Sequence, residues 1–240
     1  MPWAWYGVCL FLLLKGRTCM TKPIDHIAEY WNHRAPTFDA DHDTENLDGW
    51  RRELGRIIGE PENKKTLDIG TGTGFLAMML AELGFESYGI DVAEEMMKLG
   101  REHAADRNVH VEFVLGEGES LPWEDNTFSA VVNARVLWTL VDPIQSLREW
   151  RRVLEPGGKM LGFTRMPRSA EEIAAAEAAG RKQNYYGEDF HEELPLRNAS
   201  PAELEAALKE AGYRNVQVIH LPAEISNATA NPWICAYGEK

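Results

Sequence analysis

Cysteine is scarce in this chain. Its 240 residues include three cysteines, Cys9, Cys19 and Cys235, and no two of them are spaced as a CxxC pair. This number and spacing exclude a disulfide framework and a zinc site built on cysteine pairs. The seven histidines do not form an HExxH ligand motif either. We therefore expect a protein of the reducing cytoplasm that has no metal centre.

Basic residues are also few. The 25 lysines and arginines are outnumbered by 38 acids, which gives a formal net charge of −13. A general nucleic-acid binder needs a surplus of Lys and Arg for the phosphates, so this class is disfavoured. Arg148, Arg151 and Arg152 cluster on one predicted helix. They could form a local basic patch, but a solvated helix face is the simpler interpretation.

The chain lacks an apolar run long enough to cross a bilayer comfortably. The candidate is Trp3 to Leu14, which is shorter than the roughly 20 residues that a spanning helix needs. It also lacks the positive start and cleavage site of a secretory signal. Residues 1–19 are interpreted as an extension outside the fold, with a membrane-associating anchor as the alternative.

Strand and helix patterns alternate along the rest of the chain, which is long enough for one domain with a buried core. This alternation predicts a doubly wound, seven-stranded, mainly parallel sheet, whose last two strands pair as an antiparallel hairpin at the edge. Capping boxes at 169–172 and 200–203 open two of the helices. The other expected helices are 25–34, 46–58, 75–83, 93–105 and 143–154, and the expected strands are 66–69, 86–90, 109–115, 129–133, 159–164, 215–220 and 233–237.

A glycine-rich segment is the most informative local feature. Residues 67–74 read LDIGTGTG, an apolar strand that breaks into three alternate glycines before a helix. Such a turn at a helix N-terminus binds a nucleotide-like ligand. Asp68 at the strand tip would repel a pyrophosphate and attract a cationic amino acid moiety. Asp91 ends the next strand, 17 residues after Gly74, where an acid can accept hydrogen bonds from both ribose hydroxyls.

Four motifs in this order resemble one family. LDIGTGTG, GID at 89–91, GEGESLPWEDNTF at 116–128 and RRVLEPGG at 151–158 are similar to the class I S-adenosylmethionine-dependent methyltransferases, and most of all to the small-molecule subgroup of type 11. The resemblance covers about residues 64–165 well. It implies a Rossmann-like methyltransferase fold, S-adenosyl-L-methionine as cofactor, and in-line transfer of a methyl group to a small-molecule acceptor.

The resemblance also implies which residues bind the cofactor. The family usually has Asp at the position of Glu117, Ala at Gly118 and Asp at Ser129, so the adenine contacts are expected to differ in detail. Asp68, Gly70, Thr71, Gly72 and Gly74 are expected at the methionine part, Asp91 at the ribose, Val92, Glu117 and Gly118 at the adenine, and Asn133 and Ala134 at the methionine end.

The same comparison divides the chain into segments. Residues 20–62 resemble the helical lid over the cofactor in this family, and the aromatic, acidic stretch after residue 165 reads as an insertion. The expected division is 1–19 as a non-core extension, 20–62 as the lid, 63–165 as the cofactor-binding core, 166–199 as an inserted cap, and 200–240 as the C-terminal helix and edge hairpin that complete the core.

No residue is assigned to catalysis, because methyl transfer depends largely on alignment of nucleophile and methyl group. A base is needed only if the acceptor arrives protonated. Weak candidates are His33, Arg135 and Trp138. Arg135 could hold an anionic substrate or pair with the acidic cap, while Trp138 could be core and His33 structural. The candidate substrate residues are Tyr30, Arg135, Trp138, Tyr185 and Tyr186.

Two other functions share this kind of sheet. A nicotinamide-dependent dehydrogenase is disfavoured because the glycines are spaced GxGxG rather than GxGxxG, and because Asp68 stands where a pyrophosphate would approach. A non-catalytic S-adenosylmethionine-binding protein is the other alternative. The segment after the fourth strand reads NARV rather than NPPY, which disfavours methylation of amino groups in nucleic-acid bases.

Overall fold

The computed structural model describes residues 23–39, 45–62, 64–179, 194–225 and 232–240. The predicted extension 1–19 and the cap tyrosines Tyr185 and Tyr186 lie outside these ranges. Among the described residues, none of the helices is long and apolar enough to cross a membrane.

Seven strands form one sheet in the order β3-β2-β1-β4-β5-β7-β6. The first five strands are parallel, and β7 runs antiparallel to both β5 and β6. This confirms the predicted doubly wound, mainly parallel sheet and its antiparallel pair of final strands. The strands are β1 (Lys65–Ile69), β2 (Glu86–Asp91), β3 (Val111–Leu115), β4 (Phe128–Ala134), β5 (Leu154–Arg165), β6 (Arg214–His220) and β7 (Trp233–Glu239).

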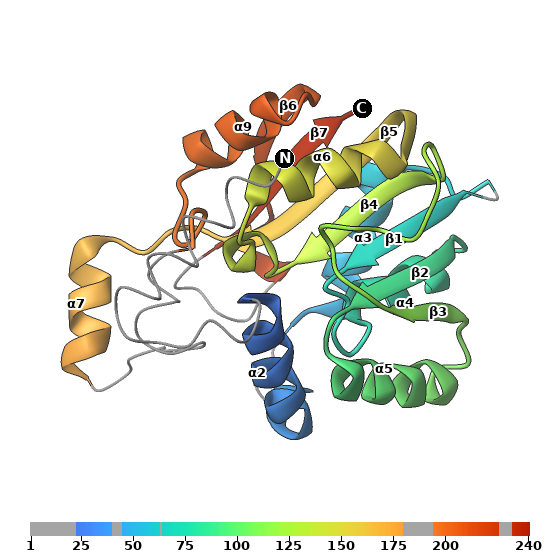
Figure 1. Ribbon diagram of the computed structural model, residues 1–240, viewed down its shortest axis with the longest axis horizontal. Helices are drawn as coiled ribbons and strands as arrows, with labels where there is room; N and C mark the ends of the chain where they lie inside the picture. Colours follow the sequence, from blue (N-terminus) through green and yellow to red (C-terminus); the bar gives the residue numbers. More distant parts are fainter. Residues whose placement is uncertain (1–22, 40–44, 63, 180–193, 226–231) are drawn as a thin grey trace.

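Helices cover both faces of the sheet (Figure 1). The core on one face lies under α6 and α9 and includes the fully buried Trp150. The core on the other face lies under α3 and α4 and includes the fully buried Trp50. The helices are α2 (Pro23–Phe38), α3 (Leu47–Ile58), α4 (Phe75–Glu82), α5 (Glu94–Asp106), α6 (Pro143–Val153), α7 (Ala170–Ala178) and α9 (Pro201–Glu210), with short 3₁₀ turns η2 (Leu137–Thr139) and η3 (Ala223–Ile225).

Helix starts follow the predicted capping signals. Asp142 accepts a hydrogen bond from the backbone N–H of Gln145 at the start of α6, and Pro143 takes the first helical position. Ser200 and Glu203 form a complete capping box at α9, and Ser169 and Glu172 form one at α7. Figure 1 shows α7 standing apart from the sheet.

Several boundaries differ from the sequence prediction. Helix α2 continues to Phe38 instead of ending at Arg34, because Ala35 and Phe38 pack with Trp31 against Ala93 and Met96 at the start of α5.

Strand β5 begins at Leu154 rather than Lys159. Leu154 pairs with Phe128 and Lys159 pairs with Ala130, so the residues between Leu154 and Lys159 form a bulge within the strand. Strand β3 begins at Val111 rather than Val109, because the backbone N–H of Val109 donates to Ala104 and closes α5.

Candidate functional site

A cavity of about 520 Å³ lies at the carboxyl ends of β1, β2 and β4. This is the edge where open α/β sheets bind ligands, and the volume is in the range of small-molecule sites, about 300–1,000 Å³. Besides the glycine loop, the wall is built from α2, α5 and the segments that follow β3 and β4. The residues that line the cavity include Ile24, Ile27, Trp31, Asp39, Glu45, Leu47, Asp68, Asp91, Val92, His103, Glu119, Arg135 and Val136.

The glycine loop between β1 and α4 needs its glycines. Gly70, Gly72 and Gly74 have φ values of +63°, +54° and +85°, which side chains rarely adopt. A Cβ atom on Gly70 would lie 2.4 Å from Cγ2 of Val136. The loop therefore packs directly against the segment that follows β4.

Two carboxylates accept hydrogen bonds from this loop and from the residues next to it. The backbone N–H of Gly72 donates to Oδ2 of Asp91 over 2.8 Å, and the N–H of Ala93 donates to Oδ1 over 2.9 Å. Asp68 accepts from the Thr71 hydroxyl over 2.8 Å and from the N–H of Ala77 in α4 over 3.2 Å. An anion such as pyrophosphate would meet two carboxylates at the N-terminus of α4, whereas a cation would be attracted.

Burial raises the pKa of both of these acids. The pKa of Asp68 is raised to about 7, because desolvation outweighs the hydrogen bonds from Thr71 and Ala77. The pKa of Asp91 is also raised by desolvation, against three backbone hydrogen bonds. A positive charge in the cavity would favour the ionised form of each acid. The site is thus electrostatically suited to a cationic ligand.

Helix α2 forms one wall of the cavity through Ile24, Ile27 and Trp31. Its end is attached to the site, since Asp39 accepts from the Thr73 hydroxyl over 2.9 Å and lies 3.3 Å from Nε2 of His103. These contacts join α2 to both the glycine loop and α5.

Glu45 forms a buried junction at the other side of the cavity. Its side chain is 3% exposed, and Oε1 accepts from Arg135 over 2.8 Å and from Arg165 over 3.1 Å. Oε2 accepts from the indole N–H groups of Trp50 and Trp233 over 3.1 and 3.2 Å. One carboxylate thus gathers donors from α3, β5, β7 and the segment after β4.

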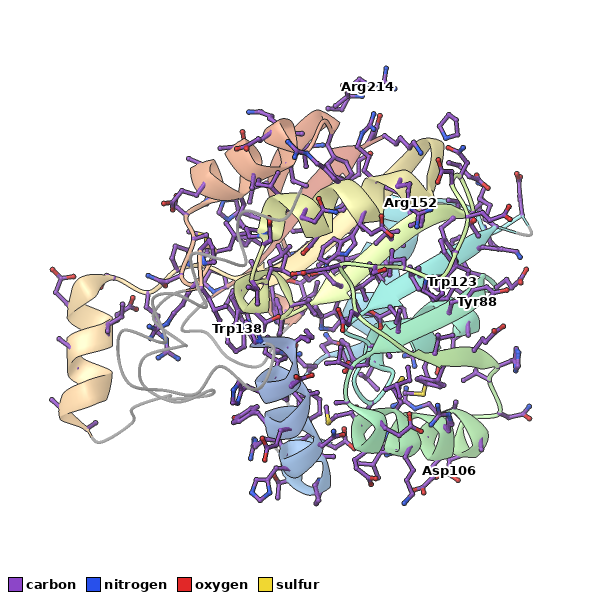
Figure 2. All side chains as sticks on the ribbon, viewed as in Figure 1. Tyr88, Asp106, Trp123, Trp138, Arg152 and Arg214 are labelled. Carbon is purple, nitrogen blue, oxygen red and sulfur yellow. The ribbon has the colours of Figure 1, made fainter. Side chains whose placement is uncertain are left out.

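The cavity brings together many of the sequence-predicted residues. Those in its wall are Asp68, Gly70, Thr71, Gly72, Asp91, Val92, Gly118, Ala134 and Arg135. Those outside the described wall are Gly74, Glu117, Asn133, Tyr30, His33 and Trp138. Asn133 is fully buried, and within the described ranges its side-chain amide has no hydrogen-bond partner. Figure 2 shows Trp138 on the η2 turn after β4. The roles of all these residues stay predictions.

Sequence reasoning missed Glu45, Asp39 and His103 as parts of the site. Glu45 precedes α3 in a polar stretch and meets Arg135 across 90 residues of chain, so no local pattern could have indicated it. Among the described residues, Arg135 pairs with the carboxylate of Glu45. The acidic part of the cap, which was the alternative partner predicted for Arg135, lies outside the described ranges. Groups of His, Cys, Asp or Glu able to hold a metal ion do not occur in the described part.

Comparison with known proteins agrees with this geometry. Residues 67–162 match the family described as "Methyltransferase domain". These residues are therefore similar to a methyltransferase domain. Demethylmenaquinone methyltransferase of Renibacterium salmoninarum is 29% identical over 149 residues, 61% of this chain and 61% of that protein. The chain spans only about half to three fifths of the length of such curated relatives.

Solved structures share the fold of this methyltransferase domain and its surrounding elements. A protein of Thermotoga maritima, described as an S-adenosylmethionine-dependent methyltransferase and possible histamine N-methyltransferase, has a TM-score of 0.62 at 19% identity, covering 88% of this chain and 99% of that one. Phosphoethanolamine N-methyltransferase 2 of Haemonchus contortus, solved with S-adenosyl-L-methionine, has a TM-score of 0.56 at 16% identity, covering 78% and 51%. The predicted Rossmann-like methyltransferase fold is confirmed.

Proposed function

We propose that this protein is an S-adenosyl-L-methionine-dependent methyltransferase that acts on a small-molecule acceptor. The observation that carries the proposal is a pair of carboxylates at the glycine loop: buried Asp68, which accepts from the N–H of Ala77 in α4, and half-buried Asp91, which accepts from the N–H of Gly72 in the loop. In a dinucleotide-binding protein these donors face a pyrophosphate. Here the N–H groups of Gly72 and Ala77 already donate to acids, and the acid-lined cavity fits a ligand that carries a sulfonium and an ammonium group.

The cofactor would supply a methyl group on a sulfonium centre, which makes the group open to in-line displacement. Asp68 and the Gly70–Gly74 loop would hold the methionine part, and Asn133 and Ala134 would lie at the same end. Asp91 would bind the ribose hydroxyls, and Val92, Glu117 and Gly118 would surround the adenine. By fixing both reactants, these residues can contribute on the order of 7–11 kcal/mol through orientation alone.

Other parts of the chain would complete the site. We propose residues 20–62 as its lid, because α2 forms a cavity wall and is tied to the loop through Asp39. Residues 63–165 would be the cofactor-binding core, 166–199 an inserted cap and 200–240 its completion, with 1–19 as a non-core extension. We also propose a cytoplasmic location, on the basis of the cysteine content.

The proposed acceptor is a small molecule that bears a ring. Relatives named demethylmenaquinone methyltransferase suggest a demethylated quinol as one candidate. The apolar side chains of Ile24, Ile27 and Leu47 in the cavity wall support a ring-bearing acceptor of this kind.

Calorimetry with S-adenosylmethionine, S-adenosylhomocysteine and NADH tests the cofactor assignment. Binding of the first two at micromolar levels is expected, and binding of NADH alone would contradict it. Transfer of a radiolabelled methyl group to a demethylated quinol or to components of a metabolite extract then separates an enzyme from a non-catalytic binding protein. Labelled product is expected; cofactor binding without any labelled product would favour the non-catalytic alternative.

A further inference from the structure

Arg135 has an unusual backbone conformation at the end of β4. Its φ is +63°, in the left-handed region that non-glycine residues seldom occupy. The backbone N–H donates to the carbonyl of Phe163 in β5 over 2.9 Å, which fixes this conformation. Backbone strain of this kind persists where the surroundings impose it and is concentrated at functional sites.

The guanidinium group of Arg135 is held in one orientation. It donates to Glu45 over 2.8 Å and lies 4.6 Å from the ring centre of Trp233, within the distance of a cation–π contact. Arg165 shares both partners, at 3.1 Å from Glu45 and 4.2 Å from the same ring centre. Glu45, saturated by four donors, is suited to orienting these groups and poorly suited to accepting a proton.

Arg135 also lies at the right place for the acceptor. Val132 of β4 is in register with Asp68 of β1, so the segment after β4 runs beside the glycine loop. Val136, the next residue, packs against Gly70. The Arg135 side chain therefore lines the cavity next to the loop proposed to hold the methionine part, where the methyl group would be transferred.

The cavity wall around the Arg135 guanidinium group carries several acidic side chains. Asp39, Asp68, Asp91 and Glu119 all line the same cavity. Such a wall attracts a cationic cofactor but repels an anionic acceptor unless a positive group compensates locally. A guanidinium matches the planar geometry of a carboxylate or a similar oxyanion, and it remains charged at every physiological pH.

We propose that Arg135 contacts an anionic oxygen atom of the methyl acceptor and that Glu45 is a positioning residue that orients its guanidinium group. The inference rests on the proposed methyltransferase function and names its substrate class: acceptors with a carboxylate or another ionised oxygen beside an apolar body. The apolar body would lie against Ile24, Ile27 and Leu47.

The test compares two probes of equal shape, 2-naphthoate and 2-naphthamide, titrated into the complex of the full chain with S-adenosylhomocysteine. Charge-assisted hydrogen bonds of about 1.5–3 kcal/mol imply that naphthoate binds roughly 10–100-fold more tightly than naphthamide. R135Q is expected to remove this preference, and R135K to restore part of it. R148Q, at an exposed arginine of α6, is the matched control and should keep it.

The positioning role of Glu45 has its own readout. E45Q should weaken naphthoate binding about fivefold or more, while the affinity for S-adenosylhomocysteine stays unchanged. In the R135Q background the same E45Q change should have no further effect on naphthoate, because Glu45 acts through Arg135. An undiminished E45Q effect in that background would overturn the positioning role.

Failure of the inference and failure of the proposed function are distinguishable. Absence of S-adenosylhomocysteine binding by the unmodified chain would overturn the proposed function. Normal cofactor binding without a preference for naphthoate over naphthamide, or with a preference that survives R135Q, would overturn the anionic-acceptor inference alone. In that case the contacts between Glu45 and Arg135 would serve only to hold the segment after β4 in place.

Discussion

Charged side chains gather at both edges of the sheet, where the strands begin and where they end. At the amino edge, Arg152 of α6 makes two hydrogen bonds to Glu149, one to Asp125 and others to the carbonyls of Leu121 and Trp123. Figure 2 shows Arg152 on the same side of the molecule as Trp123 and Tyr88. Pairing with Arg152 lowers the pKa of the Glu149 carboxyl, so this edge stabilises its charges.

At the carboxyl edge, by contrast, the surroundings destabilise the charged forms of the acids. Asp68 and Asp91 have raised pKa values because burial disfavours their ionised forms. Arg135 is held in a left-handed conformation, and the glycines of the loop have positive φ values. The buried acids and the strained backbone lower the stability of this edge and preorganise the cavity, as is typical of functional sites. The comparison predicts that substitutions at the two edges separate ligand affinity from stability.

The largest effect is expected for Asp91→Ala. The change removes the carboxylate proposed to accept both ribose hydroxyls, and it leaves the N–H groups of Gly72 and Ala93 without their acceptor. We expect S-adenosylhomocysteine affinity to fall about 100-fold, equivalent to about 2.7 kcal/mol, as measured by calorimetry. An affinity within about threefold of the unmodified chain would contradict the ribose assignment.

Gly70→Ala should come next. The new Cβ would clash with Val136 and force a left-handed alanine, which together cost about 2–4 kcal/mol of unfolding free energy. Gly157→Ala is the matched control at the other edge, because Gly157 has a φ of +78° but open space around it. It should cost only about 1–2 kcal/mol and leave ligand affinity unchanged. Equal denaturation midpoints for the two variants would show that packing against Val136 is unimportant.

Arg152→Ala at the amino edge should lower the stability of the chain without lowering its affinity for the ligand. Loss of its partly exposed carboxylate and carbonyl contacts should lower the unfolding free energy by about 1–2 kcal/mol, measured by urea denaturation. S-adenosylhomocysteine affinity should stay within twofold. A clear loss of affinity in a folded variant would mean that the two edges are coupled.

Asp68 is expected to make the stability of the folded chain depend on pH. The pKa of Asp68 in the folded chain is about 7, which is above the ordinary value of 3.8 expected in the unfolded chain. Between pH 3.8 and about pH 7 the folded chain therefore retains a proton that the unfolded chain has released. The stabilising contribution is fully present below pH 3.8 and is lost as pH rises through about 7.

Asp68→Asn keeps a neutral side chain at every pH and serves as the comparison. Without ligand, its melting temperature should gain about 3 °C or more on the unmodified chain between pH 4 and pH 8. A constant difference across this range would argue against a raised pKa. The same variant should bind S-adenosylmethionine more weakly, since the amide carries no negative charge.

Local signals explain why much of the fold and the cofactor side could be predicted. The strand, the acid at residue 68 and the alternate glycines stand together in the sequence, and capping residues such as Asp142 and Ser200 act within one helical turn. These features depend on neighbours in the chain, so a pattern can reveal them.

The acceptor side depends on contacts between distant segments. Glu45 meets Arg135, Arg165 and Trp233 only because the sheet places β4, β5 and β7 side by side. The left-handed conformation of Arg135 is likewise imposed by its hydrogen bond to Phe163 in the next strand. Neither the partner nor the strain leaves a mark in the local sequence, which explains why Glu45 was missed.

The position of β7 has a consequence for the synthesis of the protein. This strand lies between β5 and β6, both of which leave the ribosome before it, so the sheet stays open at this place until residues 233–239 have been translated. Trp233, which binds Glu45 and lies under the Arg135 guanidinium, arrives with the same strand. A nascent chain can therefore form its glycine loop before β7 exists, whereas the junction of Glu45, Arg135 and Trp233 forms only after residues 233–239 have been translated.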